Sequence, residues 1–275
     1  MAADTQDIAD FYTTPLGGLT ASLLRRELDA LWPTITGLSI LGIGHAMPCL
    51  ESWQQKTRCI SLTPAHMGGM HWPAEKPNMV CVAETESLPF ADLSFDRVIL
   101  VHGLEQAENV RRTLREVWRV LKDDGRLIVV LPNRRSMWAY AESTPFGHGQ
   151  PYSEGQLSRL LKGLFFTVER QKTALYAPPL TMKLALQCFW LAERWGPFLA
   201  PHFAGLVIAE ASKALYGATP VKRRALARRV LVAAERMGAP TLGAESNKTH
   251  SAEPTPRPHS PSHHRLKCTH PQSGG

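Results

Sequence analysis

The chain has 275 residues, of which 44% are hydrophobic, and a formal net charge of +7; this suits one ample domain followed by a tail. The sequence has no apolar run of about 18 residues, which excludes a membrane span, and its polar start, "MAADTQDIADFY", lacks the pattern of a signal peptide. Five scattered cysteines without a CxxC pair exclude a disulfide or metal framework and favour reduced thiols in a cytoplasmic protein.

Residues 1–33 form a helical lead in front of the main domain. Within it, "LTASLLRRELDALW" (Leu19–Trp32) carries apolar residues at helical spacing, and Thr20 is in the position of an N-cap. We therefore predict a helix in this stretch with Thr20 as its cap.

Strand and helix patterns alternate through residues 34–216. The predicted helices are "AENVRRTLREVWRVLK", with apolar positions from Val110 to Leu121 on one face, "SEGQLSRLLKGL", with Ser153 as its cap, and an apolar helix at Leu180–Trp195. Short apolar or β-branched runs predict the strands, at "LSILGI", "TRCISL", "NMVCVAE", "FDRVILVHG", "GRLIVVLPN", "FFTVERQKTALY" and "FAGLVIAEASKALY". Buried strands separated by helices predict an α/β fold with a doubly covered, Rossmann-like sheet.

Four predicted strands are followed by segments that should meet at one edge of this sheet. Because ligands of such folds bind at the carboxyl ends of the strands, these segments are the candidate site. They are Gly42–Met47, Ser61–Pro64, Glu84–Thr85 and His102–Glu105.

The turn "LGIGHAMP" is compatible with several cofactor loops. A phosphate loop needs a Lys-Ser or Lys-Thr pair, which is missing, and a dinucleotide loop needs a third glycine where Met47 stands. A GxGxG-like loop for S-adenosylmethionine remains, with Ala46 in the third place. The glycines at Gly42 and Gly44 serve equally well in a plain tight turn. From these residues alone, the two interpretations are even.

The segment "AETESLPFADLSFDRVILVHGLEQAENVRRTLREVWRVLKDDGRLIVVLPN" resembles the class I S-adenosylmethionine-dependent methyltransferases of the type 11 group. The likeness rests on "LPF", "SFD" and the pattern from Leu114 to Gly125, and it extends from about Leu38 to Leu161. "LGIGHAMP", "HWP" and "NRRSMW…TPFGHGQPYS" further resemble a little-characterised bacterial subgroup. The resemblance implies a seven-stranded sheet, mostly parallel with an antiparallel last strand, and S-adenosylmethionine as the cofactor.

The resemblance also implies roles for individual residues. Gly42, Gly44, His45 and Ala46 match the loop that faces the methionine part of the cofactor, Glu84 and Thr85 match the adenine contacts, and the segment starting at His102 matches the cavity wall. Ser61 stands where the family normally has an acidic residue for the ribose. Because charge-assisted hydrogen bonds are the stronger ones, this departure is expected to weaken ribose binding by about 1–2 kcal/mol.

A methyl acceptor that must lose a proton needs a base, and no metal is required. We expect His148, which lies between two glycines, or Tyr152 to act as this base. A histidine in such a loop can equally well have a structural role, by capping or stabilising the loop. Arg134 and Arg135 are in place to hold an anionic substrate, and the resemblance suggests that Tyr12 closes over the site.

We therefore predict a cytoplasmic S-adenosylmethionine-dependent methyltransferase with an unidentified acceptor, a small molecule being favoured. The alternative is a degenerate relative that binds the cofactor weakly or not at all and serves as a binding or regulatory protein. A basic helix at 217–237, with "VKRRALARR" (Val221–Arg229), leaves RNA open as a less favoured partner. Residues 238–275 are rich in Pro, Ser, Thr and His and are predicted to be disordered.

Overall fold

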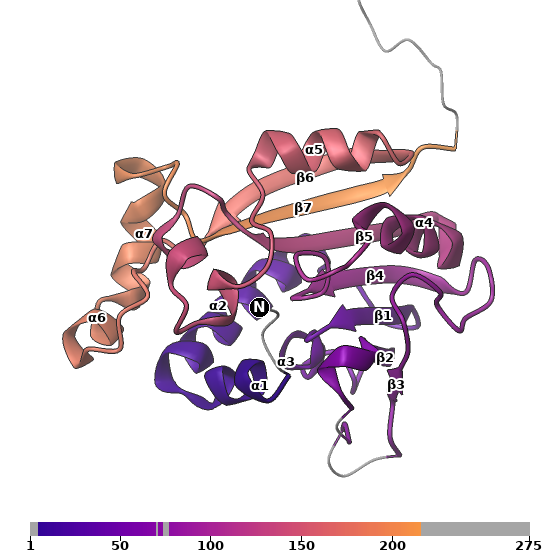
Figure 1. Cartoon of the computed structure of the whole chain (residues 1–275), viewed down its shortest axis with the longest axis horizontal. Coiled ribbons are helices and arrows are strands. Elements are labelled where there is room, and N and C mark those ends of the chain that lie inside the picture. Colours follow the sequence, from indigo (N-terminus) through magenta and orange to yellow (C-terminus); the bar gives the residue numbers. More distant parts are fainter. Residues whose placement is uncertain (1–4, 70, 74–76, 216–275) are drawn as a thin grey trace, which may run out of the picture. The chain divides into compact units, whose positions relative to one another are not determined.

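A seven-stranded sheet organises the protein (Figure 1). The computed structural model describes residues 5–69, 71–73 and 77–215, so the predicted basic helix at 217–237 and the tail at 238–275 lie outside the described residues. The strand order is β3-β2-β1-β4-β5-β7-β6, and β7 is antiparallel to both of its neighbours while the remaining neighbours are parallel. The strands are β1 (Ser39–Gly44), β2 (Arg58–Thr63), β3 (Val80–Val82), β4 (Phe95–Val101), β5 (Leu121–Pro132), β6 (Phe166–Ala174) and β7 (Leu206–Lys213). The predicted α/β fold with an antiparallel last strand is confirmed.

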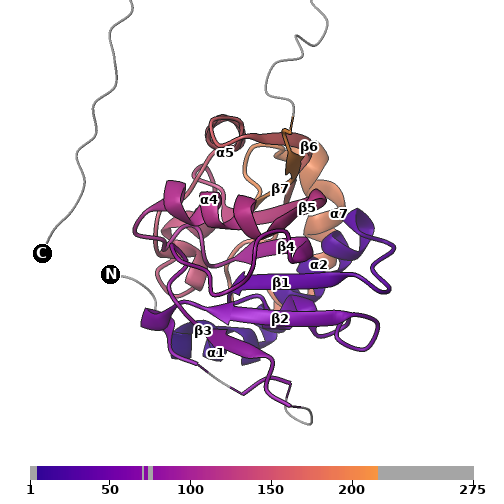
Figure 2. The same cartoon turned by 90° about the vertical axis from the view of Figure 1, so that its right-hand side faces the viewer.

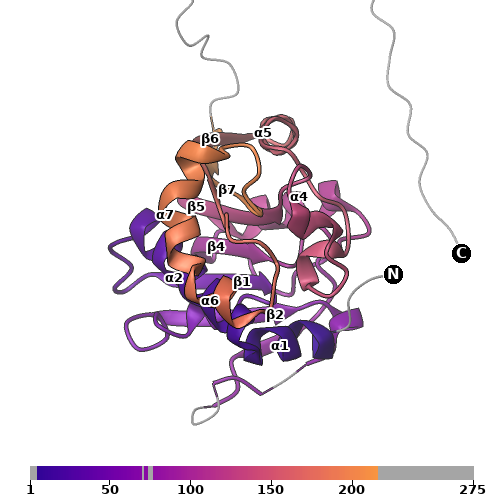
Figure 3. The same cartoon turned by 90° about the vertical axis from the view of Figure 1, so that its left-hand side faces the viewer.

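Helices cover both faces of the sheet, as the two side views show (Figures 2 and 3). One apolar core joins the sheet to α2 and α3, and the other joins it to α4 and α5. Successive strand side chains supply the two cores in turn: Ile40 packs in the first and Leu41 in the second. The helices are α1 (Thr5–Thr13), α2 (Pro15–Leu31), α3 (Met47–Leu50), α4 (Val110–Val120), α5 (Glu154–Lys162), α6 (Lys183–Gln187) and α7 (Phe189–Leu199).

Helix α2 begins earlier than the apolar spacing of Leu19–Trp32 indicates. The cap is Thr14, whose hydroxyl accepts a hydrogen bond from the Gly17 amide, and Pro15 occupies the first turn. The prediction of Thr20 as the cap is wrong. Its hydroxyl donates to the Leu16 carbonyl inside the helix, because α2 already begins at Pro15. Gly17, which has no side chain, lets this first turn pack closely against the backbone of Phe11 and Tyr12 in α1.

Other helix boundaries differ in smaller ways. Ser153 does cap α5, in a reciprocal capping box with Gln156. Leu121, predicted on the face of α4, instead begins β5. The predicted apolar helix at Leu180–Trp195 is divided into α6 and α7, with Cys188 between them.

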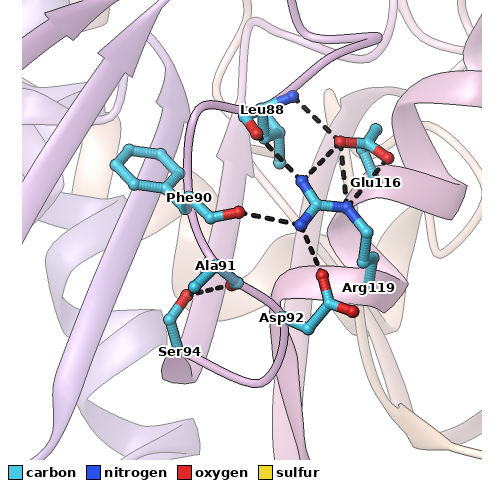
Figure 4. Close-up of polar contacts among 7 residues, drawn as sticks. All are labelled: Leu88, Phe90, Ala91, Asp92, Ser94, Glu116 and Arg119. Atoms are coloured by element: carbon cyan, nitrogen blue, oxygen red, sulfur yellow. Dashed lines mark hydrogen bonds and ion pairs between the residues drawn. The ribbon is translucent and has the colours of Figure 1, made fainter.

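The family-like sequence "LPF…SFD" is held to α4 by Arg119 (Figure 4). The guanidinium of Arg119 donates to the carbonyls of Leu88 (2.9 Å) and Phe90 (2.8 Å) and pairs with Glu116 and Asp92, each at 2.7 Å. Glu116 accepts in turn from the Leu88 amide at 2.9 Å. These residues therefore form a structural clamp that fixes the loop between β3 and β4.

Candidate functional site

The glycine turn at the end of β1 is required by internal packing. Gly44 has φ +87°, and a Cβ atom there would lie 2.7 Å from the amide nitrogen of Gly103, in the loop after β4. A Cβ atom on Gly42 would lie 2.6 Å from the Cβ of Ala46 and 2.7 Å from the Cδ1 of Leu50, in α3. Both glycines thus let the turn and α3 pack against β4 and β1, whether or not a ligand is bound.

His45 follows this turn and lies under α1. Its amide donates to the Val101 carbonyl at 2.8 Å, which ties the turn to β4, and its ring stacks on Tyr12 with centroids 5.3 Å apart and an interplanar angle of 12°. Burial, followed by the charge of His102, lowers the pKa of His45 to about 3. The imidazole is therefore neutral near pH 7.

A buried chain of hydrogen bonds runs from α1 into the loop after β4. The hydroxyl of Tyr12 lies 2.9 Å from Nε2 of His102, and Nδ1 of His102 lies 3.2 Å from Oε1 of Glu105. Burial, followed by the charges of Cys49 and Glu105, raises the pKa of the Tyr12 phenol well above its usual value, so the phenol keeps its proton. Tyr12 does lie over the predicted site.

The sequence alone does not predict this chain of hydrogen bonds. Tyr12 and His102 are 90 positions apart, and the only local signal was the three-residue spacing of His102 and Glu105. His102 has φ +54°, an uncommon backbone conformation for a residue with a side chain, and both members of the His102–Glu105 pair are almost completely buried.

The residues predicted to hold the ribose and adenine lie along the neighbouring strands. Ser61 pairs in register with Gly42 and is fully buried, and Thr63, at the end of β2, is 1% exposed. Thr85 is buried with its hydroxyl 3.2 Å from that of Thr113, whereas Glu84 beside it is exposed. The carboxyl edge therefore carries Gly42, Gly44, His45, Ser61, Glu84, Thr85 and His102, as the order of the strands requires.

The two predicted bases lie in different cavities. His148 shares a cavity of about 480 Å³ with Asp7 and Asp10 of α1, and its Nε2 is 2.9 Å from the carbonyl oxygen of Glu142. Tyr152 lines a second cavity of about 480 Å³ together with Arg134. Burial, followed by the charge of Glu105, raises the pKa of Tyr152. The structure therefore does not bring His148 and Tyr152 together.

Another cavity, of about 360 Å³, opens beside the glycine turn. It is lined on one side by Tyr12, His45 and Met47 and on the other by Arg25 and Trp72. Its walls are mainly apolar, and its size is in the range of small-molecule pockets. Of the residues predicted to bind the cofactor, His45 is the one that lines it.

Six buried polar atoms near the carboxyl edge have no hydrogen-bond partner within the described part of the chain. They are Nδ1 of His45, Oγ of Ser61, Oγ1 of Thr63, Oε2 of Glu105, and Oε1 and Nε2 of Gln106. Buried polar groups are normally paired, so unpaired atoms here are suited to a polar ligand. Residues 5–69, 71–73 and 77–215 contain no cluster of three or more His, Cys, Asp or Glu residues that could hold a metal ion.

Comparison with known proteins agrees with this arrangement. Residues 41–129 match the family model described as a methyltransferase domain, which spans β1 to most of β5. The chain is 29% identical over 103 residues to the ubiquinone/menaquinone biosynthesis C-methyltransferase UbiE of Geotalea uraniireducens, covering 38% of this chain and 39% of the relative. It is 30% identical over 115 residues to the uncharacterized protein YafS of Escherichia coli, covering 42% of this chain and 44% of the relative. The chain thus spans less than half of the length of these curated relatives.

A solved structure shows the same fold over a larger part of the chain. The S-adenosylmethionine-dependent methyltransferase of Thermotoga maritima superposes with a TM-score of 0.50 at 19% identity, covering 70% of this chain and 89% of that protein.

Proposed function

We propose that the chain, whose residues 41–129 match a methyltransferase domain, transfers a methyl group from S-adenosylmethionine to a small-molecule acceptor. The observation that carries this proposal is the set of unpaired buried polar atoms at the carboxyl edge of a sheet with this strand order. A ligand with hydroxyl, amino and carboxylate groups offers partners to these atoms. The mainly apolar cavity of about 360 Å³ beside His45 supports a small acceptor.

In this proposal the chain's own residues bind and orient the reactants. The unpaired hydroxyls of Ser61 and Thr63 replace the missing ribose acid, Glu84 and Thr85 contact the adenine, and the backbone at His45 faces the methionine part. When bound, the cofactor supplies an activated methyl group. Alignment of the acceptor with that group accounts for much of the rate of such a displacement.

Removal of a proton from the acceptor is proposed for groups near Glu105. The His102–Glu105 pair is favoured over the two bases expected from the sequence, because burial raises the pKa of Tyr152 and keeps its phenol protonated, and Nε2 of His148 is within hydrogen-bonding distance of the Glu142 carbonyl, in another cavity. When Glu105 is ionised it accepts from Nδ1–H of His102, so Nε2 accepts from the Tyr12 hydroxyl. The Tyr12 hydroxyl can take up the proton of the acceptor only as it passes its own proton to Nε2 of His102, and Glu105 then stabilises the resulting imidazolium.

Calorimetric titration of the full chain with S-adenosylmethionine and S-adenosylhomocysteine tests the proposal. We expect micromolar binding, and we expect Glu84→Gln to weaken it about 5- to 30-fold, through loss of one charge-assisted hydrogen bond. Glu84 is exposed, so this change leaves the core intact. Asp124→Asn, which removes an exposed carboxylate near the start of β5 at the opposite edge, is the matched control.

A change at Gly44 is not suitable for this test, because a side chain there would collide with the loop after β4 and would unfold the site. No binding up to millimolar cofactor, by a sample that circular dichroism shows to be folded, would contradict the proposal. The glycine turn would then be a structural turn, and the chain would be a degenerate relative that serves as a binding protein.

A further inference from the structure

Helices α6 and α7 present a large apolar surface to solvent. We define the α6–α7 surface by six of the large exposed side chains on or next to these helices. The most exposed are Phe198, at 81%, and Leu199, at 80%. The six side chains are Met182, Leu184, Leu191, Trp195, Phe198 and Leu199. Contiguous apolar patches of this kind mark interaction sites in soluble domains.

The outward direction of these side chains is fixed by the opposite face of α7. Phe189 is 1% exposed and packs in the core, and Gly196 lies directly against the ring of Tyr176. The carboxylate of Glu193 accepts hydrogen bonds from the amides of Leu175 (3.0 Å) and Ala177 (2.9 Å). Because Leu191, Trp195, Phe198 and Leu199 lie at positions i, i+4, i+7 and i+8, they share the other face. A rotation that buried them would break these contacts.

The surface lies at the same end of the sheet as the candidate site. The side-chain amide of Asn133, directly after β5, donates to the Ala204 carbonyl at 2.8 Å and so ties the segment after α7 to the carboxyl edge. Figures 1 and 3 show α6 and α7 at the end where the parallel strands terminate, together with α1.

The charges around the surface indicate what covers it. The segment from Pro178 to Phe203 contains one acidic residue, Glu193, and its carboxylate is bonded to the backbone on the inner face. The exposed basic residues of the segment are Lys183, Arg194 and His202. A second copy docked symmetrically here would bring like charges together, whereas an anionic lipid surface would attract them.

We propose that the α6–α7 surface binds the face of an anionic lipid bilayer, with α7 lying along the membrane plane. Exposed Trp, Phe and Leu on one face with cationic side chains beside them is the pattern of interfacial helices. With 11 residues, α7 is about 16 Å long, well short of the apolar thickness of a bilayer. Within the described residues, no helix has the length and apolar character that a membrane span requires. Binding in this orientation brings the carboxyl edge of the sheet to the bilayer.

Co-sedimentation of the full chain with lipid vesicles, without cofactor, tests this proposal separately from methyl transfer. We expect binding to phosphatidylcholine vesicles that contain about 30 mol% phosphatidylglycerol, and weaker binding to phosphatidylcholine alone. Phe198→Glu should lower the partition coefficient at least about tenfold, because burial of one phenylalanine contributes about 1.5–3 kcal/mol. Phe165→Glu is the matched control: Phe165 is 66% exposed and precedes β6, at the opposite edge, so binding should stay within about twofold.

A second measurement places the contact. Brominated acyl chains should quench tryptophan fluorescence, and Trp195→Phe should reduce the quenching. Equal vesicle binding by Phe198→Glu and the wild-type chain would overturn the proposal and assign binding to other basic residues. Absence of vesicle binding would also overturn it, and a dimer that Phe198→Glu dissociates would then identify the surface as a contact between two copies.

Discussion

Replacement of Arg119 by methionine should destabilise the domain by about 2–3 kcal/mol. The Arg119 side chain is 31% exposed and that of its partner Asp92 is 72% exposed, so this ion pair contributes little. The hydrogen bonds to the Leu88 and Phe90 carbonyls matter more, because hydrogen bonds to a charged group contribute about 1.5–3 kcal/mol each before exposure is discounted. Methionine keeps most of the aliphatic packing, so the loss is chiefly that of the polar clamp.

Urea denaturation of the full chain measures this loss, and Arg115→Met is the matched control. Arg115 lies on the same helix and is exposed, so its replacement should change the free energy of unfolding by no more than about 0.5 kcal/mol. Thermal unfolding should show a decrease in Tm of about 4–12 °C for Arg119→Met. Arg119→Lys should restore only part of the loss, because one ammonium group cannot span both carbonyls and both carboxylates.

The position of the clamp also predicts which part of the domain Arg119→Met makes less stable. Amide hydrogen exchange should accelerate in the loop from Leu88 to Ser94 and remain unchanged in α5. If Arg119→Met and Arg115→Met unfold at the same urea concentration with the same m-value, the clamp does not stabilise the fold, and this reasoning is refuted.

Two further properties follow from the environments of single ionisable groups. Burial alone would raise the pKa of Asp96, but hydrogen bonds from Lys122 and from the β1 backbone hold this pKa below its usual value. The ionised Asp96 therefore stabilises the folded protein above about pH 4, and this contribution is lost as the pH falls through the lowered pKa. Between pH 6 and pH 3 the Tm of Asp96→Asn should fall less than that of the wild-type chain, and parallel curves would contradict this assignment. Burial raises the pKa of Cys49 and of Cys59 to about 12, so both thiols should resist a thiol reagent in the folded protein. The exposed Cys188 should react at once. Rapid labelling of Cys49, located by mass spectrometry, would contradict this expectation and show that the core opens.

The order of elements and the fold class were accessible from the sequence, because they depend on local patterns. Alternating apolar runs and amphipathic segments predicted the strands and the two helices that cover one face, and Ser153 marked the start of α5. The edge at which the candidate residues gather follows from parallel strands alone. The match to a methyltransferase domain confirmed the resemblance that "LPF…SFD" suggested.

The role of each candidate residue depended on contacts that the sequence does not contain. In the sequence, the motif "LPF" and the residues Glu116 and Arg119 only indicated a family. The structure shows that they connect a loop to a helix about 30 positions away. The sequence around Gly44 suited a cofactor loop and a plain turn equally well, and only the structure shows that its missing side chain makes room for Gly103.

What the sequence determined by itself was therefore the α/β architecture and the set of segments that end at its carboxyl edge, since the periodicity of the segments and the parallel direction of the strands are sufficient for both. Only the tertiary structure decided that Tyr12 closes on His102 and Glu105, that His148 and Tyr152 lie apart, and that α7 turns its apolar face outward. Those outcomes depend on how side chains that are far apart in the sequence pack against one another. The sequence pattern alone does not specify which of them are in contact.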